Sequence, residues 1–65
     1  MNREDWRGFY RWLETASVEE LREKLQKIEA ILAVLKDRSV RADALKMRRM
    51  IEADILDRVR ASGGN

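Results

Sequence analysis

Cysteine, histidine and proline are missing from this 65-residue chain, and glycine occurs only three times. Without cysteine, the chain has no disulfide and no thiol nucleophile. Without cysteine and histidine, it also lacks the usual zinc ligands and the commonest general base. No glycine-rich phosphate loop is present, and the three serines fit helix caps or the C-terminal tail. We therefore expect no enzymatic activity, no catalytic residues, no metal and no cofactor.

Long apolar runs and targeting signals are also missing. No apolar run approaches the roughly 18 residues that a membrane span requires. The start of the chain, MNREDW, does not have the pattern of a signal peptide. Together, these absences predict a cytoplasmic protein without a membrane span.

The residues that are present suit a small helical protein. Charged residues make up 40% of the chain and hydrophobic residues 45%, with both signs of charge mixed. That hydrophobic share is too high for a disordered chain, and the mixed charges are typical of a solvated helical surface. A chain of this length buries only about 60% of the surface that its unfolded form exposes. Close helix packing or self-association must therefore supply the stability.

The segment 17–36 has the clearest helical pattern. In the motif SVEE, Ser17 and Glu20 have the spacing of a capping box, which begins a helix. The apolar residues that follow are alternately three and four positions apart, as in an unbroken heptad seam: Val18, Leu21, Leu25, Ile28, Leu32 and Leu35. We predict a helix at about 17–36.

A second helix follows, with its apolar seam in a different phase. Continuing the first seam would place Lys46 and Arg49 on the apolar stripe, so that seam stops. The new seam consists of Val40, Ala44, Met47, Ile51, Ile55 and Val59. Between the two lies KDRS, where Asp37 or Ser39 can cap a new helix. This pattern favours an antiparallel hairpin with a helix at about 40–61, and the alternative is one continuous helix from 17 to 61 in an extended coiled coil.

All four aromatic residues lie in a predicted N-terminal helix at about 3–15. Trp6, Phe9, Tyr10 and Leu13 follow the i, i+3, i+4, i+7 spacing of one apolar face. We predict that this face packs on the hairpin. The predicted fold class is all-α: a short N-terminal helix packed on a long antiparallel helical hairpin, as a single domain over 1–62 with a disordered tail at 63–65. A homodimeric helical bundle would cover the remaining apolar surface.

Several residues do not fit these apolar stripes. Trp12 points away from the N-terminal stripe, and Gly8 lies one turn before it on the same side. Trp12 either folds over its own helix or contacts a second subunit or partner. Ile31 and Val34 lie outside the seam of 17–36 and need another cover, and Met50 belongs to a residue type suited to adaptable interfaces. We predict a partner or dimer interface made by Gly8, Trp12, Ile31, Val34 and Met50.

The excess positive charge is concentrated in residues 36–49. This segment has six basic and two acidic residues, a net charge of +4, while the rest of the chain is neutral or slightly acidic. The six form a predicted basic patch: Lys36, Arg38, Arg41, Lys46, Arg48 and Arg49. It could be a solvated turn with ion pairs such as Arg48–Glu52, or a site for an acidic protein surface or a phosphate backbone. Since no aromatic residue in the segment can stack on bases, a protein partner is favoured over nucleic acid.

The arginine-rich chain, in which DWRGFYRWLETAS leads into VEELREKLQKIEAILAVLKDRS, is similar to small accessory proteins of temperate phages and other mobile elements. The resemblance implies a protein that binds and disables a host regulator or enzyme, and it assigns no functional residue. Our leading hypothesis is a non-enzymatic interaction module that binds and modulates another protein. The alternatives are a nucleic-acid-binding accessory protein that uses the basic hairpin end, and a membrane-surface helix at 3–15.

Overall fold

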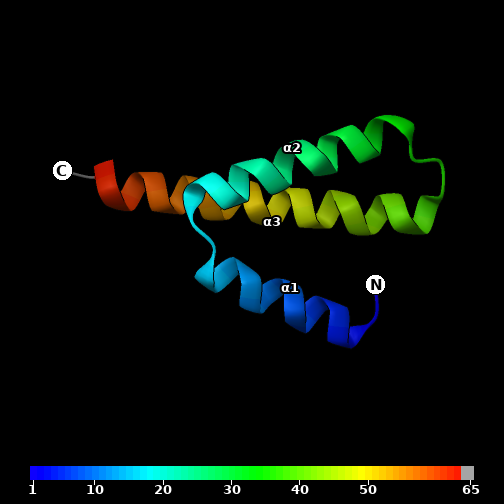
Figure 1. The fold of residues 1–65 in the computed structure, drawn as a ribbon, viewed down its shortest axis with the longest axis horizontal. Coiled ribbons are helices and arrows are strands. Elements are labelled where there is room, and N and C mark those ends of the chain that lie inside the picture. The colour runs from blue at the N-terminus through cyan, green and yellow to red at the C-terminus, as the bar shows by residue number, and fades with distance from the viewer. Residues whose placement is uncertain (64–65) are drawn as a thin grey trace.

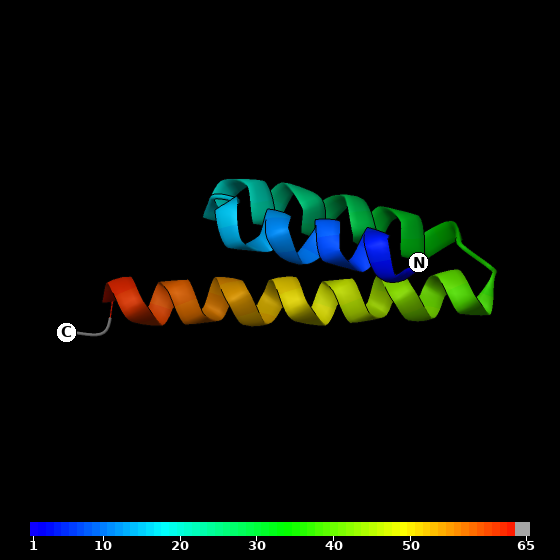
Figure 2. The same cartoon turned by 90° about the horizontal axis from the view of Figure 1, so that it is seen from below.

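The computed structural model describes residues 1–63, which form three helices joined by short loops (Figure 1). They are α1 (Arg3–Thr15), α2 (Val18–Val34) and α3 (Arg38–Gly63). Helices α2 and α3 lie side by side and run antiparallel, and Figure 2 shows α1 and α2 together on one side of α3. The predictions of an all-α fold and of a hairpin rather than one continuous helix are therefore confirmed.

Helices α1 and α2 both begin with a capping box. Ser17 Oγ accepts a hydrogen bond from the Glu20 amide, and the Glu20 carboxylate accepts one from the Ser17 amide, each at 3.1 Å. This is the box predicted from SVEE. At the start of α1, Asn2 Oδ1 accepts from the Asp5 amide at 2.9 Å, and Asp5 Oδ2 accepts from the Asn2 amide at 3.4 Å. The side chains therefore satisfy amides that have no partner inside each helix.

Helix α3 begins two residues earlier than predicted because Asp37, rather than Ser39, is its cap. Asp37 Oδ1 accepts from the Val40 amide at 3.1 Å, and the Asp37 carbonyl accepts from the Arg41 amide at 2.9 Å. The first turn therefore closes directly after Asp37, and the helix extends at its other end through Gly63. The rest of the predicted tail, Gly64 and Asn65, lies outside the described residues.

The core lies where the three helices meet. Its fully or nearly fully buried side chains come from every helix: Phe9, Ala16, Leu21, Ile28, Leu32, Ala44 and Ile51. Leu21 and Ile51 have no exposed surface. Val40 and Val59, at the ends of the predicted seam of α3, are each 48% exposed. Because α3 has 26 residues and α2 only 17, the C-terminal end of α3 extends past the start of α2 and leaves Val59 uncovered. Val40 lies in an open groove between α2 and α3 at the turn.

Two arginines of α3 hold the C-terminal ends of the other helices. Neither α1 nor α2 has a basic residue in its last turn, where a cation would stabilise the exposed carbonyls. The Arg58 guanidinium donates to the Leu13 carbonyl at 2.7 Å and to the Ala16 carbonyl, and it pairs with Asp54 at 3.2 Å.

Arg41 binds the carbonyls at the C-terminal end of α2. Its Nη1 donates to the Leu32 carbonyl at 2.6 Å and to the Leu35 carbonyl at 2.9 Å. Both guanidiniums are partly buried, so these charge-assisted hydrogen bonds are shielded from water. Helix α3 therefore binds α1 and α2 through polar contacts as well as through the core.

None of the helices described is long and apolar enough to cross a membrane.

Replacing Arg58 with Met should lower the free energy of unfolding by about 1.5–3 kcal/mol, the usual range for hydrogen bonds to a charged group. Met keeps the length of the side chain but leaves the Leu13 and Ala16 carbonyls and the Asp54 carboxylate without this donor. Urea denaturation followed by far-UV circular dichroism measures the change.

The matched control is Arg60→Met, on the same part of α3 but exposed. It should change the free energy of unfolding by less than about 0.5 kcal/mol. An equal decrease in the free energy of unfolding for the two variants would show that the hydrogen bonds from Arg58 to the end of α1 do not stabilise the fold.

Candidate interaction surfaces

The aromatic residues of α1 form one connected layer against the hairpin. Phe9 lies at its centre and is only 7% exposed. Its ring centroid lies 5.8 Å from that of Trp6 and 6.0 Å from that of Trp12. Lys46 of α3 lies 4.4 Å above the Trp6 ring, and Lys24 of α2 lies 5.8 Å above the Trp12 ring. Helix α1 therefore meets α3 on the Trp6 side and α2 on the Trp12 side.

This arrangement corrects the predicted orientation of Trp12. The side chain is half-buried and packs against the core instead of pointing away from it. The prediction assumed a single narrow stripe, but α1 lies in the groove between two helices, so a wider arc of its surface is covered. Tyr10, which was assigned to the core, is 40% exposed. Gly8 is exposed, and a Cβ placed there would have no atom within 4 Å beyond its chain neighbours and the nearby backbone of α1, so the close approach predicted for it is not made within this chain.

Trp12→Ala should therefore destabilise the monomer fold, by about 2–3 kcal/mol, because it removes a large side chain from the core. Tyr10→Ala, two residues earlier in the chain, should cost less, about 1 kcal/mol, because 40% of that side chain is already exposed. Urea denaturation by circular dichroism compares the two. A smaller loss for Trp12→Ala than for Tyr10→Ala would contradict the packing described here.

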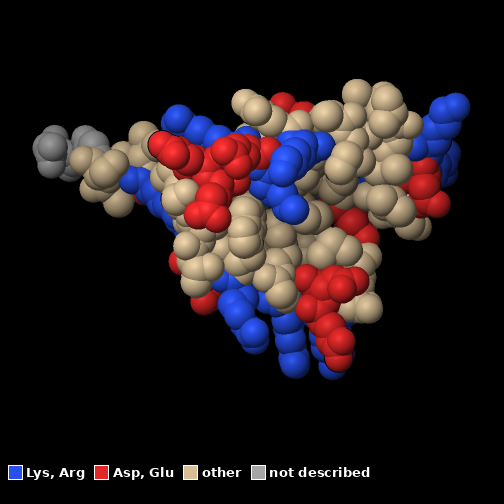
Figure 3. All heavy atoms as spheres, in the orientation of Figure 1, with Lys and Arg blue, Asp and Glu red and all other residues tan. Residues whose placement is uncertain are grey.

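A largely apolar groove lies at the turn end of the hairpin, between α2 and α3 and beyond the start of α1. Its volume is about 370 Å³, and we call it the hairpin-end groove. Apolar side chains form most of its lining: Ile28, Ile31, Val40, Ala44 and Met47. Lys24 and Lys27 lie at its rim on α2, and Asp43 lies at its rim on α3, where it pairs with the N-terminal amine. Figure 3 shows an uncharged area over this end, with both basic and acidic side chains around it.

Two of the predicted interface residues lie near each other on this face. Ile31 lines the hairpin-end groove and is 50% exposed. Trp12 lines a smaller hollow of about 190 Å³ between α1 and α2, which shares Lys24 and Lys27 with the groove. Val34 lies three residues beyond Ile31 on α2 and is 77% exposed. The α2 flank therefore presents its apolar side chains to solvent next to two lysines.

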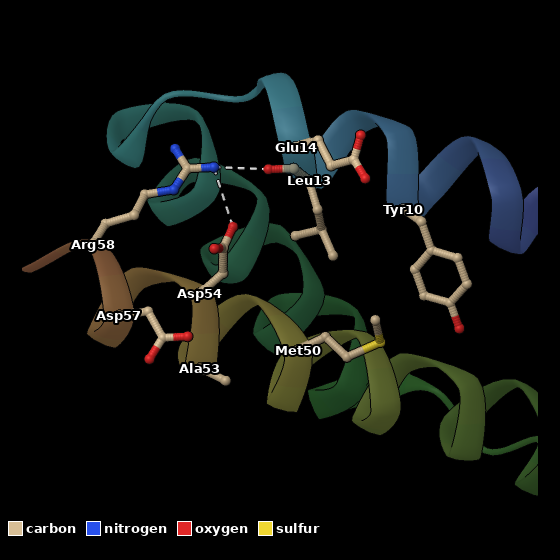
Figure 4. A pocket seen from close by; sticks show the side chains of 8 residues that line it. All are labelled: Tyr10, Leu13, Glu14, Met50, Ala53, Asp54, Asp57 and Arg58. Carbon is tan, nitrogen blue, oxygen red and sulfur yellow. Dashed lines mark hydrogen bonds and ion pairs between the residues drawn. The ribbon is translucent and has the colours of Figure 1, made fainter. Parts of the chain in front are cut away.

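Met50 is in a different place. It lines an open hollow of about 610 Å³ between α1 and α3, together with Tyr10 and Leu13 (Figure 4). The polar end of this hollow is formed by the Arg58–Asp54 pair, which also binds the Leu13 carbonyl. Met50 and the Trp12–Ile31 side are therefore not parts of one surface.

The six residues of the predicted basic patch are not gathered on one surface either. Arg41 is directed at the carbonyls of α2, and Lys46 lies over Trp6 of α1. Arg48 forms the predicted ion pair with Glu52, at 3.8 Å. The remaining three, Lys36, Arg38 and Arg49, are exposed. Lys36 and Arg38 lie at the turn, next to the hairpin-end groove, while Arg49 lies three turns further along α3.

Lys24 and Lys27 are the residues that sequence reasoning missed. They occur within a run of alternating charges and look like ordinary solvated side chains. The available signal was their spacing: Lys24, Lys27 and Ile31 follow i, i+3, i+7, which places them on one flank of α2. That flank lies next to the core seam, but it meets α1 only in part because α1 begins too far from the hairpin turn to cover Ile31.

Comparison with known proteins identifies no relative. No protein-family model, curated protein or solved structure matches the chain. Residues 1–63 contain no group of three or more acidic side chains that could hold a metal ion. The function must therefore be inferred from the surfaces themselves.

Proposed function

We propose that this chain is a small non-enzymatic interaction module that binds an acidic amphipathic helix of another protein in the hairpin-end groove. The observation that carries the proposal is the groove, in which Ile31 and Val40 are 50% and 48% exposed over a floor of buried apolar atoms. A small protein gains stability by burying such side chains, so leaving them exposed together is typical of a binding surface. Apolar grooves between two helices commonly bind a third helix.

The charge around the groove favours an acidic partner. Lys24 and Lys27 line one rim, and Lys36 and Arg38 lie at the adjacent turn. The one carboxylate on the rim, Asp43, is paired with the N-terminal amine, so its repulsion of an acidic helix is reduced. Met47 on the floor has a flexible side chain that can adjust to different apolar residues.

In this role the module would act by covering a surface that its partner needs for other contacts. This is the mode of action implied by the similarity to phage and mobile-element accessory proteins. The homodimer expected from the sequence belongs to the same proposal, because two linked grooves would bind a dimeric or repeated partner with greater avidity.

A designed peptide helix tests the groove. The probe has Leu at i, i+3, i+4 and i+7 on one face and Glu on the other, with a fluorescent label, and a second probe replaces each Glu with Lys. We expect the acidic probe to bind more tightly in an anisotropy titration. The double variant Lys24→Glu/Lys27→Glu should reverse that preference because it reverses the charge of the rim.

Ile31→Glu should weaken binding of the acidic probe at least about tenfold, since it places a charge in the apolar contact. Leu56→Glu is the matched control: Leu56 is also 50% exposed but is not part of the groove lining. It should leave the affinity for the probe unchanged. Equal binding of both probes, or equal effects of the two substitutions, would contradict the proposal.

The alternative function is nucleic-acid binding by the basic end of the hairpin. Three of its six basic residues already have partners within the fold, which weakens this alternative. A DNA duplex titrated at low and rising salt concentrations tests it, because affinity that depends on phosphate contacts falls steeply with salt. Salt-sensitive duplex binding without peptide binding would favour the alternative over our proposal.

A further inference from the structure

The surface of α3 that faces away from α1 and α2 has a second heptad seam. Figure 2 shows both other helices on one side of α3. On the outer side, residues spaced alternately four and three apart form a continuous row, which we call the outer seam: Ala42, Leu45, Arg49, Glu52, Leu56 and Val59. Leu56 and Val59 are 50% and 48% exposed, and Leu45 is half-buried. Leu45 also packs against the edge of the core, and the other members of the row are exposed within residues 1–63.

The outer seam is complementary to itself when it is reversed. Suppose that two α3 helices pack antiparallel and cross at a point between Met50 and Ile51. Each residue then faces the residue of the other chain that lies equally far from this point on its opposite side. Ala42 then faces Val59, Leu45 faces Leu56, and Arg49 faces Glu52. Each pair occurs twice because the arrangement has two-fold symmetry. Two Arg–Glu pairs therefore lie at the centre, and two apolar layers lie on each side of them.

We infer that α3 is the interface of a homodimer in which the outer seams of two chains pack antiparallel. Charge decides the direction of packing. A parallel pair would place Arg49 against Arg49 and Glu52 against Glu52, whereas the antiparallel pair brings opposite charges together. The apolar pairs would bury Leu56 and Val59, which are left exposed in a single chain.

The contacts within the chain are compatible with this dimer. Glu52 is paired with Arg48 of its own helix, but the distance is 3.8 Å and the Glu52 side chain is 55% exposed. A carboxylate has two oxygens and can accept from Arg49 of a second chain as well. Because α1 and the hairpin-end groove lie away from the outer seam, both stay accessible. The inference rests on the homodimer of the proposed function and does not depend on the groove.

Charge reversal tests the central pairs. Light scattering should give the wild-type protein a mass of twice the 7.7 kDa of one chain. Arg49→Glu and Glu52→Arg should each raise the dimer dissociation constant at least about tenfold, since each places four like charges together. The double variant Arg49→Glu/Glu52→Arg should recover the dimer. Recovery of the dimer in the double variant would show that the single substitutions disrupt the interface and not the fold. Circular dichroism checks the helix content of each variant.

Cysteine pairs test the direction, since the native chain has no cysteine to interfere. In an antiparallel seam, position 42 of one chain faces position 59 of the other. The double variant Ala42→Cys/Val59→Cys should form a disulfide-linked dimer on mild oxidation, while neither single variant should do so efficiently. Efficient crosslinking of Ala42→Cys alone would show parallel packing and overturn the inference.

Two further results would also overturn it. One is a wild-type mass equal to a single chain at every concentration up to about 1 mM. The other is loss of the dimer in Ile31→Glu but not in Leu56→Glu, which would move the interface to the α2 flank predicted from the sequence. Support requires the opposite result: Leu56→Glu is monomeric but still binds the acidic peptide. A dimer that binds no peptide would contradict the groove alone and leave this interface in place.

Discussion

Two guanidinium groups on one helix connect the three elements of this fold. Helices α1 and α2 both end without a nearby cation of their own, so each presents carbonyl oxygens that need a donor. Arg58 binds the end of α1 and Arg41 the end of α2, from positions almost five turns apart on α3. With no disulfide available, these contacts fix where each helix stops along α3, and the packing of the core follows from that alignment.

The unequal lengths of the helices decide which apolar surface is left over. Helix α3 is the longest, α2 is shorter, and α1 is the shortest at 13 residues. Arg58 aligns α1 with the far end of the hairpin, so the turn end is not covered and the hairpin-end groove remains open. On the outer side of α3, Leu45 packs against the edge of the core, and the other residues of the outer seam are exposed within residues 1–63. The groove is left open by the short length of α1, and the outer seam by the position of α1 and α2 on one side of α3.

Much of the fold could be predicted from the sequence because its signals are local. The Ser17–Glu20 capping box and the heptad seam of 17–36 depend only on spacing, and the phase change at KDRS indicates the turn. The candidate site was harder to predict because it depends on which helix faces which. Trp12 was predicted to point away from the core because its position was compared with a single apolar stripe. Helix α1 in fact packs against two helices, α2 and α3, so a wider part of its surface is covered. The basic patch was predicted from the number of basic residues in one segment. That count cannot show that Arg41 binds carbonyls of α2 whereas Lys46 lies over Trp6 of α1.

The concentration of aromatic residues in α1 has a consequence for spectroscopy. Both tryptophans and the tyrosine belong to this one helix, so the near-ultraviolet signals of the protein report on α1 alone. The far-ultraviolet signal comes mostly from α2 and α3, which together are more than three times as long as α1. The two signals therefore observe separate parts of one molecule without any label. If the two signals change together during unfolding, α1 and the hairpin form a single cooperative unit. If the near-ultraviolet signal is lost first, α1 undocks before the hairpin unfolds.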